Sequence, residues 1–246
     1  YGGYYDPEMI ENNQTNRFDL DNTMLTNEAT NGSTKTFGRY HQLNLNYNLK
    51  LDTIGKKFSV DVDYWNSNSE KRNAFLTQME RFDLGSFSNE RVKNNSDQTM
   101  RNFAGKFDFY LPYDFGTLEL GAKASFTQTE NLIDVLFASD LYPDFSNHNQ
   151  FKYQENVQAL YASFAKKLGE KWNFKVGLRG EYTQTMSDLI SENTTSERDY
   201  FKLFPTAYLQ YKPWEDHSFS VNFGRRINRP GFWEMNPARQ YSNRYS

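Results

Sequence analysis

The sequence predicts an all-β fold, an antiparallel up-and-down transmembrane β-barrel segment, and three observations carry this prediction. Apolar and polar residues alternate in about eight segments of the 246-residue chain. The connections between these segments alternate between short turns and long polar stretches. Aromatic residues make up 17% of the chain, although the mean hydropathy is low at −0.88. A barrel that crosses a membrane needs only every second residue of each strand to be apolar, so this combination suits it.

The alternation is clearest in the first hairpin, which we expect at about residues 37–65. Every odd position from Leu43 to Leu51 is apolar. After the short turn DTIGKK, the even positions from Phe58 to Tyr64 form a second apolar stripe. Successive side chains of a strand point to opposite faces of the sheet, so each strand places its apolar residues on one face.

The same hairpin unit recurs three times along the chain. The further hairpins are expected at about residues 100–127, 156–182 and 200–229, with the short turns PYDFG, LGEK and KPWEDH. The long polar stretches between the hairpins are predicted to be loops, at residues 66–99, 128–155 and 183–199. Residues 1–36 are predicted to be an opening loop, and residues 230–246 the start of the next one. Short turns at one end and long loops at the other are typical of an outer-membrane barrel.

The alternation also assigns individual side chains to the two faces of the predicted barrel wall. Charge is tolerated in a wet or plugged lumen, whereas an Arg or Lys at the lipid-facing midplane costs roughly 2–4 kcal/mol. The candidate lipid-facing residues are Leu45, Val60, Phe107, Leu120, Val176, Leu178 and Val221. The candidate lumen-facing residues are Lys175, Arg179, Glu181, Asn222 and Arg226. These polar residues have two interpretations, solvation and ion pairing within the lumen or direct contact with a transported ligand.

The last strand is predicted to end in a group of arginines. The alternation places Arg226 on the inward face and Arg225 on the same face as Phe223. Pro230 has no N–H to donate to a neighbouring strand, so we expect the ladder to stop there.

The sequence offers little support for catalysis or cofactor binding. It has no Cys, and its three His are scattered without metal-binding spacing. It contains no Gly-x-Ser-x-Gly elbow and no glycine-rich phosphate loop. The formal net charge of −3 does not indicate a nucleic-acid partner. We therefore expect no enzyme, no catalytic or metal site, no cofactor and no nucleic acid.

The ratio of about eight strands to 246 residues also indicates the size of the barrel. It corresponds to roughly 31 residues per strand, which suits a large barrel with elaborate loops. Eight strands of a large barrel cannot close, and open strand edges are not tolerated in lipid. We therefore expect this chain to be a mid-barrel fragment, with the remaining strands supplied by further sequence.

Three segments resemble a known family. They are KLGEKWNFKVGLRGEYTQT, with Gly177-Leu178-Arg179 and Glu181, then DYFKLFPTAYLQYK, then FGRRINRPGFWEMNPARQYSNRYS. In this order they resemble the outer-membrane β-barrel family of TonB-dependent receptor-like proteins of Bacteroidetes. The resemblance covers about residues 157–246, and the preceding part is similar only in its style of alternating strands.

The resemblance implies a location in the bacterial outer membrane and a barrel of roughly 22 strands in the intact protein. It implies a plug domain, energised uptake through TonB, and a surface lipoprotein as a further partner. The function expected from it is uptake of a nutrient ligand, with the siderophore, glycan and peptide classes unresolved. Two alternatives remain open, a non-transporting outer-membrane scaffold or partner-docking barrel, and a soluble β-rich glycan-binding module.

Overall fold

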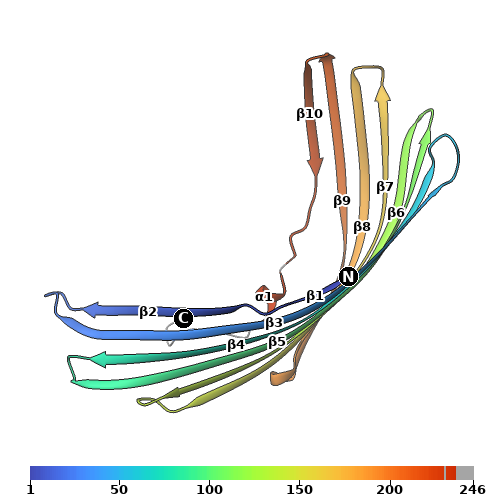
Figure 1. The fold of residues 1–246 in the computed structure, drawn as a ribbon. Helices are drawn as coiled ribbons and strands as arrows, with labels where there is room; N and C mark the ends of the chain where they lie inside the picture. The colour runs from blue at the N-terminus through green and yellow to red at the C-terminus, as the bar shows by residue number, and fades with distance from the viewer. Residues whose placement is uncertain (230, 237–246) are drawn as a thin grey trace.

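The computed structural model describes residues 1–229 and 231–236 of the chain. Ten strands form one sheet (Figure 1), and a short α-helix follows the last strand. The strands are β1 Gly2–Tyr5, β2 Glu8–Phe18, β3 Met24–Lys50, β4 Lys57–Arg81, β5 Ser86–Tyr113, β6 Gly116–Ser139, β7 Phe145–Leu168, β8 Trp172–Leu189, β9 Thr194–Trp214 and β10 His217–Gly224. A 3-10 turn, η1, covers Ile190–Glu192, and the helix α1 covers Phe232–Met235.

The sheet has up-and-down topology. From β3 to β10 each strand pairs antiparallel with the next strand in the chain, while β1 and β2 both pair with β3. All strand pairs in the described part of the chain are antiparallel. The predicted all-β, antiparallel, up-and-down fold is confirmed. The described part of the chain has ten strands instead of about eight, because the two additional strands lie in the segment predicted to be an opening loop.

The strands are much longer than the predicted hairpins. Residues 1–36 form β1, β2 and the beginning of β3 instead of a loop. Most of the polar stretches 66–99, 128–155 and 183–199 likewise continue the neighbouring strands, so that the turns between them are short. Residues 231–236 of the predicted final loop contain α1, whereas positions 230 and 237–246 lie outside the described residues.

A reversal of the alternation explains why these extensions are strands. In β6 the even positions Leu118, Leu120 and Phe126 are apolar. Further along the same strand, the odd positions Ile133 and Val135 are buried at 2% and 3% exposure. The apolar residues therefore change from one face of the sheet to the other along the strand. The extension still alternates, but its buried residues lie on the face opposite to that of Leu118 and Leu120. Because many of these residues are Asn or Thr, the pattern is not recognised as a stripe of apolar residues.

The two faces of the sheet can be followed from strand to strand, because residues directly opposite each other in an antiparallel pair share a face. We call the face that α1 contacts the inner face, and the opposite one the outer face. One row on the outer face is Tyr47, Val60, Phe107, Ala122, Leu160, Gly180 and Leu203. Equivalent rows on either side complete a continuous apolar surface from β3 to β10, which we call the outer apolar band.

The outer apolar band crosses the strands obliquely. It covers residues 58–64 of β4 and residues 201–211 of β9. The centre of the first range, Asp61, aligns through the register with Lys202, whereas the second range is centred on Thr206. The band is thus displaced by about four residues between β4 and β9, which is roughly 13 Å along the strand direction. The distance from β4 to β9 across the sheet, five strand spacings, is roughly 24 Å. The band is therefore inclined by about 30° to the perpendicular of the strands.

The sheet is bent along its strands into an open curved surface, with α1 on its concave side (Figure 1). Phe232 and Met235 of α1 pack against a buried cluster of Phe151, Tyr153 and Leu189 on β7 and β8. The inner face is therefore the concave face. Its polar side chains are brought toward one another, whereas the outer apolar band lies on the convex side.

The short turn between β3 and β4 is built around one carboxylate. Asp52 Oδ1 accepts hydrogen bonds from the backbone N–H groups of Ile54, Gly55 and Lys56, at 3.0, 2.9 and 2.9 Å. These hydrogen bonds, that of Lys56 first, hold the pKa of Asp52 below its ordinary value. Gly55 has a φ of +112°, which favours glycine at this position.

Candidate functional site

The inner face carries a network of charged side chains that extends across several strands. These residues alternate along the strands with the residues of the outer apolar band. Lys175 on β8 reaches past β7 to Glu119 on β6, with Nζ 2.6 Å from Oε2. The same oxygen accepts a hydrogen bond of 2.9 Å from the hydroxyl of Ser163 on β7. Three neighbouring strands are thus joined by one carboxylate.

A second group lies beside it, centred on Tyr161 of β7. The Tyr161 hydroxyl donates to Asp108 on β5, and Lys106 forms an ion pair of 2.6 Å with the same carboxylate. The guanidinium of Arg179 lies over the Tyr161 ring, 5.3 Å from its centroid. Tyr161 lies across Gly121 on β6, where any Cβ would come within 2.4 Å of the ring. Glycine at this position lets the ring lie flat on the sheet and reach Asp108.

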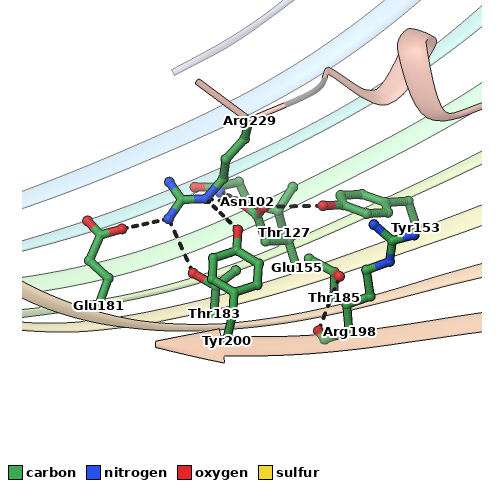
Figure 2. Close-up of polar contacts among 10 residues, drawn as sticks. All are labelled: Asn102, Thr127, Tyr153, Glu155, Glu181, Thr183, Thr185, Arg198, Tyr200 and Arg229. Atoms are coloured by element: carbon green, nitrogen blue, oxygen red, sulfur yellow. Dashed lines mark hydrogen bonds and ion pairs between the residues drawn. The ribbon is translucent and has the colours of Figure 1, made fainter. Parts of the chain in front are cut away.

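Arg179 connects this group to a third one, centred on Glu181. Figure 2 shows the contacts that Glu181, Thr183 and Tyr200 make with Arg229. Glu181 Oε1 accepts from Arg179 Nε at 2.6 Å, and its Oε2 accepts from Arg229 Nη2 at 2.6 Å. Arg229 also donates to the Thr183 hydroxyl at 3.2 Å and to the Tyr200 hydroxyl at 3.3 Å. Glu181 is 8% exposed and Thr183 is fully buried. One carboxylate therefore compensates two guanidinium groups in a largely desolvated place.

A second carboxylate lies on the other side of Arg229. Glu155 Oε2 is 3.9 Å from Arg229 Nε and accepts a hydrogen bond of 3.1 Å from the Tyr153 hydroxyl.

Arg229 belongs to a segment that leaves the sheet and folds back over the inner face. β10 ends at Gly224, and the Arg225 N–H donates to the Pro205 carbonyl at 3.2 Å. The ring of Phe232 in α1 then lies 5.5 Å from the ring of Phe151. We call residues 225–236 the inner strap, of which position 230 lies outside the described residues. The prediction that the ladder continues to Pro230 is wrong, because the chain turns inward six residues earlier.

Four of the five candidate lumen-facing residues lie together on the inner face. Lys175, Arg179 and Glu181 alternate along β8, and Asn222 of β10 shares their face through Tyr208. The fifth, Arg226, lies beyond the end of β10, in the inner strap, where it lines a cavity against the inner face. Arg225 lines the same cavity instead of continuing the outer row of Phe223, because the strand has already ended.

The seven candidate lipid-facing residues all lie on the outer face. The register places Leu45, Val60, Phe107, Leu120, Val176, Leu178 and Val221 in the outer apolar band. Their exposure in the isolated chain reaches 71% at Val221 and 62% at Leu45. That this face contacts lipid stays a prediction.

Several residues of the inner network were not among the predicted ones. They are Lys106, Asp108, Glu119, Glu155, Tyr161, Thr183, Tyr200 and Arg229. Asp108 and Glu119 lie at inward positions of the same alternation that identified Lys175, so the sequence could have indicated them. Arg229 carried no such signal, because the fold-back of the inner strap cannot be read from strand periodicity.

Within residues 1–229 and 231–236, no helix combines the length and apolar character needed to span a membrane. Across the same ranges, no group of three or more His, Asp or Glu side chains is arranged to hold a metal ion.

Known structures similar to this chain include three outer-membrane transporters or receptors. The ferric citrate transporter FecA in its unliganded form aligns with a TM-score of 0.43 and 11% identity over 90% of this chain. The siderophore receptor PiuA from Acinetobacter baumannii gives 0.44 and 10% over 87%, and the copper transporter OprC gives 0.44 and 9% over 94%. The chain covers only 42%, 44% and 47% of these proteins, respectively. No curated protein is a significant match.

A family model also matches the chain. The model described as the outer membrane protein beta-barrel family matches residues 49–246, which is most of the chain and includes the three segments on which the sequence resemblance rests. The match covers β4 to β10 and the inner strap, that is, all of the inner-face network described above. The chain therefore belongs to the outer membrane protein β-barrel family, and its place is the bacterial outer membrane.

Proposed function

We propose that this chain forms part of the barrel wall of a TonB-dependent receptor that takes up a nutrient ligand of the siderophore, glycan or peptide class. The observation that carries the proposal is the opposite chemistry of the two faces of the same strands. The outer face is an apolar band, while the inner face at the same level carries ion pairs such as Lys175–Glu119 and Arg229–Glu181. A wall between lipid and an aqueous or plugged lumen requires this arrangement.

Lipid contact of the outer apolar band is supported by its extent and its inclination. In water, a monomeric protein rarely exposes a contiguous apolar surface larger than a few hundred Å². Leu178 at 50% and Val221 at 71% exposure are parts of such a surface. Strands in transmembrane barrels are tilted by about 35–45°, and a lipid-facing band would then cross them obliquely, as this one does. These features count against a soluble glycan-binding module.

The inner face supports a transport path in preference to a catalytic centre. Its charged groups are paired with one another, as in the Lys106–Asp108 and Arg179–Glu181 pairs. Such pairing holds these charged groups against one another. It provides a polar wall along which a hydrated ligand can move.

The sheet is open, and further strands would complete the barrel. β10 pairs with β9 on one side, and β2 and β1 pair with β3 at the other end, within the described part of the chain. Unpaired strand edges are costly in lipid. We infer that the chain is a partial barrel domain of an intact barrel of roughly 22 strands, and that a plug domain and TonB act with it. A surface lipoprotein would be a further partner.

The proposal can be tested by uptake measurements on cells that produce the intact protein. Labelled ferric siderophores, oligosaccharides and oligopeptides are offered to cells with and without the gene, and to cells whose inner-membrane proton gradient has been collapsed. We expect accumulation of at least one of these classes to require both the gene and the gradient.

Two outcomes would contradict the proposal. Unchanged accumulation of all three classes after deletion, with the protein present in the outer membrane of the parent cells, would favour a scaffold or partner-docking barrel. Recovery of the protein in the soluble fraction with its β-structure intact would favour the soluble module.

A further inference from the structure

A cavity of about 480 Å³ lies between the inner strap and the inner face of the sheet. Its floor is formed by β7, β8 and β9, and its cover by the first residues of the inner strap. Pockets of about 300–1,000 Å³ are the usual size for small ligands. The cavity therefore has room for a compact molecule held between the barrel wall and the strap.

The charge of this cavity is strongly unbalanced. Arg179, Arg225, Arg226 and Arg229 line it, and Glu181 is its only carboxylate among the described residues. Arg179 and Arg229 both use that one carboxylate. Among residues 1–229 and 231–236, no carboxylate is found within ion-pair distance of Arg225 or Arg226. The described lining thus carries four positive charges and one negative charge.

Arg179 and Arg229 are half-buried, and Arg225 and Arg226 are exposed at the mouth of the cavity. Like charges gathered around one cavity repel one another, and an anion placed among them relieves the repulsion. Guanidinium groups bind carboxylates and phosphates in a planar, two-pronged manner, with more geometric specificity than an ammonium group offers. The Ser163 and Thr206 side chains add hydroxyls to the lining, and Phe204 and Ile227 add apolar walls. The lining thus suits a small ligand that has several anionic groups on a compact body.

We propose that this cavity binds a small polyanionic ligand, one that carries two or more carboxylate or phosphate groups. The inference rests on the proposed uptake function and specifies it, because it names the chemical class of the transported ligand. The inner strap contributes two of the binding arginines, Arg225 and Arg226, while the barrel wall contributes Arg179. Glu181 keeps Arg179 and Arg229 in position.

The test uses the full-length protein purified in detergent, with citrate and inorganic pyrophosphate as probes and maltose as the neutral control. Isothermal titration calorimetry is expected to show binding of at least one of the two anions, weakened by added salt, and none of maltose. Arg226→Gln and Arg225→Gln should each weaken anion binding about tenfold. Arg101→Gln is the matched control, since Arg101 lies on the outer face between Asn66 and Gln128 and loses the same charge.

Equal affinity of the wild type and the two strap variants would overturn the proposal, as would an equal loss in Arg101→Gln. Absence of any anion binding by a folded wild-type protein would also overturn it. If the strap variants instead released the plug domain, the arginines would be binding an acidic protein segment. These results are distinct from failure of the uptake function, because a receptor for a neutral ligand would still accumulate that ligand in energised cells.

Discussion

The guanidinium of Arg229 contacts the carboxylate of Glu181 at 2.6 Å, although the two residues are 48 positions apart. The contact fastens the inner strap to the barrel wall, and Glu181 also accepts from Arg179. The side chain of Glu181 is only 10% exposed. Water therefore has little access to its carboxylate and cannot replace the hydrogen bonds that Arg179 and Arg229 donate. This carboxylate is the point at which the strap, the cavity and the sheet meet.

The first prediction concerns this point. Glu181→Gln removes the charge that two guanidinium groups share, and leaving such groups poorly compensated costs about 1–3 kcal/mol. We expect the strap to be released more often, so that trypsin cleaves after Arg225 and Arg226 about ten times faster, as measured by mass spectrometry. Glu197→Gln, on the outer face of the same hairpin, is the control and should leave the rate unchanged. Equal rates in the two variants would show that Glu181 does not hold the strap.

A second prediction separates the two faces of β8. Val176→Arg places a charge in the outer apolar band, at a cost of roughly 2–4 kcal/mol at the lipid midplane. Heat-modifiable, folded protein in outer-membrane fractions should fall strongly for this variant. Lys175→Ala removes a half-exposed ion pair with Glu119, worth about 0–1 kcal/mol, and should assemble nearly as well as the wild type. If both variants assembled equally, the assignment of the faces would be wrong.

A third prediction tests the packing of Tyr161 on the inner face. Alanine at Gly121 would place its Cβ 2.4 Å from the ring, which must then move away from Asp108 and Arg179. We expect Gly121→Ala to lower the melting temperature in detergent by several degrees, in keeping with a cost of about 1–3 kcal/mol for overpacking. Gly105→Ala, where no heavy atom lies within 4 Å of the new Cβ, should melt like the wild type. A lower melting temperature for Gly105→Ala alone would contradict this account.

A fourth prediction concerns pH and the turn at Asp52. The pKa of this carboxyl is lowered below 3.8 in the folded protein by the backbone N–H groups that it accepts from. A depressed folded-state pKa contributes stability that is present above pH 3.8 and is lost as the pH falls through the folded-state value. Asp52→Ala should therefore melt at a lower temperature than the wild type at pH 7, and the difference should shrink below pH 3.8. A difference that is independent of pH would mean that the charge of Asp52 plays no part.

Much of the sheet could be predicted from the sequence, because one physical pattern determines it. In the segment from Leu43 to Leu49, every second side chain is apolar, and the register with Val60 and Val62 follows from matching these stripes. The same alternation correctly placed Lys175, Arg179 and Glu181 on one face. It worked because the outward-facing residues of these strands are large and apolar, and their neighbours are strongly polar.

The extensions and the strap could not be predicted in the same way. In residues 128–135 the buried positions include Thr129 and Asn131, which are polar and typical of loops, so the reversed alternation was hidden. The inner strap depends on contacts between Arg229 or Phe232 and residues far away in the sequence. Such long-range contacts leave no local pattern.

In the proposed barrel the outer apolar band faces lipid and the inner face lines the lumen. The chain contains no Cys, so it adds no background when single cysteines are introduced at Leu120, Val176 and Val221 on one face, and at Lys175 and Asn222 on the other, with any Cys of the remaining protein replaced by Ser. Spin labels at these positions in intact outer membranes report access to oxygen, which partitions into lipid, and to a water-soluble nickel chelate. The account predicts oxygen access at the first three positions and access to the chelate, or to neither reagent where a plug covers the wall, at the other two. Access of the chelate to Val176 and Val221 equal to that at Lys175 and Asn222 would contradict it.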